Sequence, residues 1–184
     1  MQGPSGSGKS TLLRGLARLV PHTGLLTLDG TAAEGMPAHE WRRRVTLLPS
    51  PAVPLAPTVR ADLLLPFSLK TRRGTRPPDD ATLRAELDGL GLGPIPLGRS
   101  TGELSQGQLL RVALLRAVLA GPEILLLDEP TANLDPASSA LVAARVLMFV
   151  RGGGALVVAG HTPPWDEVER VFRIEGGRLQ EGSR

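Results

Sequence analysis

The sequence predicts an α/β fold in which strands and helices alternate around a mostly parallel β-sheet. Two strands are expected over 124–129 and 155–160, and the continuous apolar residues with which the first begins and that fill most of the second are typical of strands buried inside such a sheet. A helical segment from about 135 to 151 lies between them. Because a strand, a helix and another strand in succession form the unit of layered α/β proteins, these observations favour a parallel sheet.

The first hundred residues carry shorter patterns. Leucines at 12, 13 and 16 and a valine at 20 recur at helical spacing, and an Asp-Gly pair at 29–30 closes a short strand. The elements expected here are a helix over 9–20, short strands over 25–30 and 45–48, an irregular proline-rich stretch over 48–58, helices around 58–69 and 81–90, and an exposed loop over 71–80.

Capping residues mark the helices of the second half. Ser105 and Gln108 form a capping box, and the helix that they begin ends at the Gly-Pro pair 121–122. Asp135-Pro136 supplies an N-cap and a proline at the first helical position of the next helix. Residues 172–179 then predict a strand, a turn and a strand.

Length and composition fit one globular domain over residues 1–184. The chain has no cysteine, which excludes disulfides and thiolate metal sites. No apolar run reaches the ~18 residues that a membrane-spanning helix needs, so we expect a cytosolic location. The net charge is +3, but the basic residues are scattered and are almost all arginine. We interpret this as a compositional bias rather than a nucleic-acid surface.

A complete phosphate-loop pattern, G-x-x-x-x-G-K-[ST], runs from Gly3 to Ser10. Its glycines let successive backbone N–H groups point at one anion, and the helix that follows directs its N-terminal dipole at the same place. Lys9 would reach the outer phosphates, and the Ser10 hydroxyl would coordinate Mg²⁺. The structural alternative is a flexible terminus rich in glycine and serine.

Two carboxylates, Asp128 and Glu129, follow the apolar run at 124–127. The carboxyl end of a buried parallel strand faces the ligand crevice of an α/β sheet. Asp128 is suited to hold Mg²⁺ there, and Glu129 to polarise the water that attacks a γ-phosphate. In the alternative interpretation, both carboxylates simply end a strand and face solvent.

The order of several segments resembles the ATP-binding cassette (ABC) ATPases. They are the phosphate loop, LSQGQ at 104–108, ILLLDEP at 124–130, ANLD at 132–135 and His161 after a buried strand. The usual family signature is LSGGQ, so Gln106 replaces a glycine. The resemblance runs from Gly3 almost to the C-terminus. It implies a P-loop NTPase core with a mostly parallel sheet and a helical signature subdomain at about 58–120.

The resemblance also implies a role for each matching residue. The residues that would bind the phosphates of ATP are consecutive: Gly3, Pro4, Ser5, Gly6, Ser7, Gly8, Lys9, Ser10 and Thr11. Ser10 and Asp128 would hold Mg²⁺. Glu129 would be the catalytic base, assisted by Lys9 and by His161 at the γ-phosphate. Taken alone, His161 is equally compatible with a structural role.

Two further residues would act on ATP bound to a second subunit. Ser105 and Gly107 lie at the start of the helix over 106–120, and a helix N-terminus attracts anions. The resemblance implies that they cap the nucleotide in trans, with Asp135 near the seam between the subunits. The alternative is that Ser105 and Asp135 only cap their own helices.

The sequence departs from the family pattern in two places. The family begins with roughly two to three dozen more residues, which supply the strands before the phosphate loop and an aromatic residue that stacks on adenine. We expect this chain to lack those strands, and its Met1 to be internal to a longer protein. The family also has a glutamine where alignment of VTLLPS places Ser50, which weakens the expected coupling to the transport partner.

The leading functional prediction is the nucleotide-binding subunit of a bacterial ABC transporter, which uses ATP and Mg²⁺. Its expected partners are an integral membrane permease and a second copy bound through the ATP sites, with no nucleic acid. Its expected place is the cytoplasmic face of the cell membrane. The stretch ADLLLPFSLK loosely resembles short cassettes of metal-export type. Two alternatives stay open: a soluble cassette ATPase acting on nucleic acid or ribosomes, and a non-functional truncated fragment.

Overall fold

A computed structural model of the chain describes residues 1–69, 75–160 and 169–182. It divides into two compact units, each described separately below. The first unit comprises Met1–Ser50, Pro122–Pro130 and Ala155–Arg184. The second comprises Pro51–Gly121 and Thr131–Gly154.

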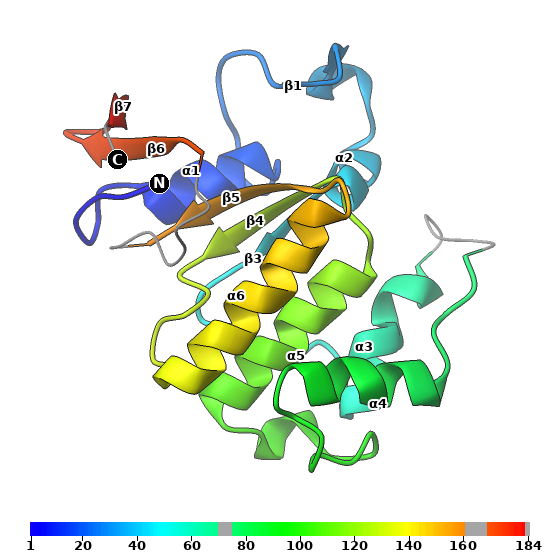
Figure 1. Ribbon diagram of the computed structural model, residues 1–184. Helices are drawn as coiled ribbons and strands as arrows, with labels where there is room; N and C mark the ends of the chain where they lie inside the picture. The colour runs from blue at the N-terminus through cyan, green and yellow to red at the C-terminus, as the bar shows by residue number, and fades with distance from the viewer. Residues whose placement is uncertain (70–74, 161–168, 183–184) are drawn as a thin grey trace. The chain divides into compact units, whose positions relative to one another are not determined.

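The first unit is built on the parallel sheet that the sequence predicts (Figure 1). Its strands are β3 (Val45–Leu48), β4 (Ile124–Asp128) and β5 (Ala155–Ala159), in the order β3-β4-β5. The central strand β4 is buried along most of its length, as its apolar run predicts. In contrast, β5 is mostly half-buried. Helix α1 packs against it.

Residues 1 and 2 extend the hydrogen bonding of this sheet beyond β5. They lie between β5 and β6 (Val171–Glu175) and bond to both. The bonds run from Met1 N to Val158 O (2.6 Å), from Gly160 N to Met1 O (3.1 Å), from Gln2 N to Phe172 O (2.7 Å) and from Ile174 N to Gln2 O (2.9 Å). No strand element precedes the phosphate loop in the described residues, yet these two residues fix the start of the loop on both sides.

Two short antiparallel hairpins complete the first unit. One joins β1 (Thr27–Leu28) to β2 (Thr31–Ala32) around the predicted Asp-Gly turn, and the other joins β6 to β7 (Arg178–Gly182). The second hairpin agrees with the strand–turn–strand pattern predicted over 172–179.

Helix α1 (Lys9–Leu16) packs against the sheet and forms the core of the first unit. The buried core residues come from five separate segments: Leu13, Ala17, Ala33, Trp41, Val45, Leu126 and Ala159. The helix is shorter than the range 9–20 that the leucine spacing predicts. Arg18 takes a left-handed φ of 52°, and its guanidinium donates to Ala33 O and, at 2.7 Å, to Met36 O. The helix therefore ends at the contact of Arg18 with residues 33 and 36, although the helical spacing of apolar residues continues to residue 20.

Helix α2 (Ala38–Arg44) is not among the elements that the sequence pattern predicts. Seven residues are too few to show a helical period. What holds the helix is Trp41, which is 3% exposed and donates from Nε1 to Leu16 O at 2.8 Å.

The second unit is helical and includes a short 3₁₀ turn, η3 (Thr101–Glu103). The first unit has one such turn among its described residues, η1 (Ala33–Gly35). The helices of the second unit are α3 (Val59–Ser68), α4 (Asp80–Gly89), α5 (Gln106–Leu119) and α6 (Pro136–Arg151). Helix α5 packs against the other three. All four begin at a side-chain N-cap: Thr58, Asp79, Ser105 and Asp135. Among the described residues, we find no helix with the length and apolarity needed to cross a membrane.

Candidate functional site: a phosphate loop beside a pair of carboxylates

The phosphate loop over residues 3–8 is closed by its own lysine. The Lys9 side chain is 6% exposed, and its ammonium donates to Gly3 O at 2.7 Å and to Pro4 O at 3.1 Å. Ser7 N also donates to Pro4 O, at 3.2 Å. Gly8 has a φ of 101°, a left-handed conformation that disfavours residues with a side chain. These bonds give the loop a closed, compact form, which fits the predicted phosphate loop better than the alternative of a flexible glycine- and serine-rich terminus.

Gly3 lies where the chain has no space for a side chain. A Cβ built on it would stand 2.8 Å from Ile174 O and 2.8 Å from Ser7 Oγ. One of these neighbours belongs to β6 and the other to the loop, so the glycine allows the loop to pass close to the sheet.

We predict that Gly3→Ala destabilises the protein by about 1–3 kcal/mol, because a backbone carbonyl must shift to admit the methyl group. Chemical denaturation measures the effect. Gly35→Ala is the control, since a Cβ there meets no atom within 4 Å. Equal stability of the two variants would contradict the close approach at Gly3.

The loop residues fit a phosphate-bearing ligand. Ser7 Oγ is buried and has no hydrogen-bond partner among the described residues, which is costly unless a ligand or a water supplies one. Helix α1 starts directly behind the loop, and its N-cap, Gly8, has no side chain to satisfy the N–H groups of the first turn. A phosphate would accept from both sources.

Asp128 and Glu129 end the central strand of the same unit. Asp128 is 4% exposed and pairs in register with Ala159 of β5. Because Met1 bonds to the residues on either side of Ala159, Asp128, Ala159 and Met1 lie at one level of the sheet. Two strand spacings, about 10 Å, separate Met1 from Asp128. The carboxylates and the start of the phosphate loop therefore lie at the same end of the sheet, where β4 and β5 have their carboxyl ends; this end is called the sheet edge below.

Glu129 takes an unusual backbone conformation. Its φ is 48°, which is uncommon for a residue other than glycine, and its N–H donates to Ala159 O at 2.8 Å. Strained residues of this kind cluster at functional sites, where the surrounding structure fixes them. Here the hydrogen bond to β5 fixes the turn that follows the strand.

A magnesium site at this edge would use Ser10 and Asp128. The described residues contain no group of three or more histidine, cysteine or acidic side chains able to hold a metal. Mg²⁺ usually takes one or two carboxylates, several waters and the phosphates of its substrate, so a site of this kind needs no such cluster.

The signature segment lies in the second unit and has the predicted capping box. Ser105 is exposed; Gln108 N donates to its Oγ at 3.2 Å, and Ser105 N donates to Gln108 Oε1 at 2.9 Å. A Cβ on Gly107 would approach Leu134 Cδ2 to 2.9 Å, so a larger residue here requires the leucine side chain to shift. Gln106 is exposed, which explains how a glutamine replaces the usual glycine.

Asp135 caps α6 as predicted, accepting from Ser138 N at 2.9 Å. Hydrogen bonds from Ser138 lower the pKa of Asp135 and keep it charged at neutral pH. His161 lies outside the described residues, and its predicted role stays a prediction. Ser50 follows β3 and is half-buried.

Comparison with known proteins agrees with this arrangement. Residues 1–132 match the family described as ABC transporter. Protein STAR1 of Oryza sativa subsp. japonica is 38% identical over 174 residues, which are 94% of this chain and 48% of that protein. The Fe(3+) ions import ATP-binding protein FbpC of Streptomyces coelicolor is 36% identical over 181 residues, 96% of this chain and 51% of that protein.

A solved structure of a bacterial Atm1-family ABC exporter with ATP bound matches with a TM-score of 0.82 and 25% identity, over 98% of this chain and 32% of that one. The chain thus spans about half or less of these relatives' lengths. Their names include an importer and an exporter, so they do not single out metal export. Since the family match covers most of the chain, the chain belongs to the ABC transporter family, as the order of its motifs predicts.

Proposed function

We propose that this chain binds ATP at the loop over residues 3–11 and hydrolyses it to drive transport through a membrane-embedded partner. One observation carries the proposal: a lysine-closed phosphate loop with an unpartnered Ser7 hydroxyl lies at the same sheet edge as Asp128 and Glu129. ATP hydrolysis needs both parts, because the phosphates must be held and the attacking water must be oriented.

The loop residues bind and orient the phosphates in this proposal. Backbone N–H groups of the loop and of the first turn of α1 donate to phosphate oxygens, and Lys9 places a positive charge beside them. Ser10 and Asp128 would hold Mg²⁺, which neutralises the charge that develops on phosphate oxygens. Ser7 Oγ gains the partner that it lacks in the protein alone.

Glu129 is the proposed catalytic base. It immediately follows the proposed metal ligand, and its left-handed turn fixes its backbone at the sheet edge. A carboxylate in this position would accept a proton from the attacking water as the terminal phosphate departs. His161 would contact the same phosphate.

The exposed start of α5 would complete the site of a second copy of the chain. Ser105 and Gly107 lie at a helix N-terminus, whose partial positive charge suits a phosphate presented from outside. Two copies would then close on two ATP molecules, with Asp135 near the seam.

A permease partner and a place at the membrane are part of the same proposal. Relatives include multidrug resistance proteins of Lactococcus lactis named as both ATP-binding and permease proteins. A separate permease would place this chain at the cytoplasmic face of the cell membrane. Phosphate release from ATP with Mg²⁺, and its stimulation by a co-expressed permease, test the proposal; a folded protein that releases no phosphate in either case would refute it.

Substitutions at Ser105 separate its two possible roles. Ser105→Ala removes the cap and should cost about 1 kcal/mol of stability. Ser105→Asp keeps a good cap but places a negative charge where a phosphate would approach, so it should keep stability and lower ATP turnover at least about tenfold. Thermal unfolding and phosphate release measure the two effects. Full turnover in Ser105→Asp would show that Ser105 only caps its helix.

A further inference from the structure

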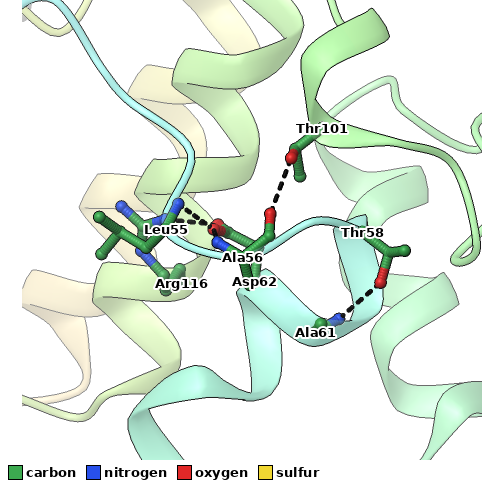
Figure 2. Close-up of polar contacts among 7 residues, drawn as sticks. All are labelled: Leu55, Ala56, Thr58, Ala61, Asp62, Thr101 and Arg116. Carbon is green, nitrogen blue, oxygen red and sulfur yellow. Dashed lines mark hydrogen bonds and ion pairs between the residues drawn. The ribbon is translucent and has the colours of Figure 1, made fainter.

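A buried carboxylate in α3 organises a network within the second unit (Figure 2). The Asp62 side chain is 0% exposed. Its Oδ1 accepts from Leu55 N at 2.7 Å and from Ala56 N at 3.0 Å, and its Oδ2 accepts from the guanidinium of Arg116. A buried charge with this many donors is well satisfied, and removing the carboxylate leaves its donors unpaired.

Arg116 connects this network to helix α5. Its side chain is 11% exposed, and it lies in the last turns of the helix that begins behind Ser105. Helices α3 and α5 pack against each other along this contact. The Asp62–Arg116 ion pair therefore joins the backbone of residues 55–56 to the body of α5.

A second connection reaches the segment just before Ser105. Thr101, which is 4% exposed, donates from Oγ1 to Ala56 O at 2.7 Å, as Figure 2 shows. The backbones of residues 56–60 and 97–101 also run side by side. Their bonds are Thr101 N to Pro57 O (3.1 Å), Val59 N to Arg99 O (3.0 Å) and Arg60 N to Leu97 O (2.8 Å). Three residues then separate Thr101 from Ser105.

We infer that Asp62 and Thr101 are positioning residues for Ser105. Asp62 connects residues 55–56 to Arg116 in the body of α5, and Thr101 connects Ala56 to the segment that precedes α5. The proline-rich segment after Ser50 and the start of α5 therefore move together. The inference rests on the proposed action of Ser105 on a second copy. Neither residue touches ATP in this proposal; each acts through the placement of the helix start.

The test measures two binding events separately. In a Glu129→Gln background, Asp62→Asn and Thr101→Val should weaken ATP-dependent dimerisation at least about fivefold. ADP affinity, which reports on the phosphate loop of the first unit, should change less than about twofold. Thr101→Ser keeps the hydroxyl and should restore dimerisation. Glu86→Gln is the control, because it breaks another ion pair of the second unit, with Arg145 at 2.9 Å.

Hydrogen exchange of the protein without nucleotide gives an independent readout. Both variants should speed exchange of the amides over 104–108, and Glu86→Gln should not. Unchanged exchange there, or equal losses of ADP affinity and dimerisation, would overturn the inference. If Asp62→Asn does not fold, the Thr101→Val and Thr101→Ser pair decides. If Glu129→Gln itself stays monomeric in ATP, the proposed action in trans fails, while the exchange result still decides whether Asp62 and Thr101 fix the helix start.

Discussion

Replacing Glu129 with glutamine should leave ATP binding intact and lower the rate of hydrolysis at least about a hundredfold. A positioned general base contributes roughly 10²–10⁴ to a rate, and the amide cannot take the proton from the attacking water. Glutamine has the shape of glutamate, and the backbone bond from residue 129 to Ala159 O does not involve the side chain. The substitution therefore changes chemistry more than structure.

The measurement pairs phosphate release with nucleotide binding. Calorimetric titration with Mg²⁺ and ATP should give a dissociation constant within about threefold of the parent, and size exclusion should show a dimer that needs ATP. Glu181→Gln is the control: it removes an exposed carboxylate that pairs with Arg170 in the β6–β7 region. Unchanged turnover in Glu129→Gln would remove Glu129 as the base, and lost ATP binding would assign it to the binding of nucleotide instead.

Features specified by neighbouring residues were predictable from the sequence. The capping box at Ser105, the cap at Asp135 and the buried strand β4 depend on residues within a few positions of one another, and the structure has each of them. The phosphate loop was predictable for the same reason, because its spacing is local.

Features that depend on distant pairing were not predictable. The support that β5 and β6 give to residues 1 and 2 involves residues more than 150 positions away. Helix α2 is held by the burial of Trp41 rather than by its own pattern. No local pattern singles out Asp62, and only the folded chain brings Arg116 to it. In each case a tertiary contact supplies what the local sequence lacks.

Replacing Lys9 with alanine should abolish useful nucleotide binding. When the Lys9 ammonium donates to phosphates, it gives up or shares its bonds to Gly3 O and Pro4 O. The bonds to phosphate are charge-assisted on both sides and are therefore strong, so their loss weakens binding. We expect the dissociation constant for ATP to rise at least about a hundredfold, which corresponds to about 2.7 kcal/mol.

Two variants separate the charge of Lys9 from its packing. Lys9→Met keeps most of the buried stem and should lose nucleotide nearly as fully as Lys9→Ala, because the loss comes from the charge. Arg14→Ala removes an exposed positive charge further along the same helix and should leave the dissociation constant within about twofold. Ordinary ATP affinity in Lys9→Met would mean that the loop over residues 3–8 binds phosphate through its backbone alone. The proposed site would then have to be redrawn around Ser7 and the first turn of α1.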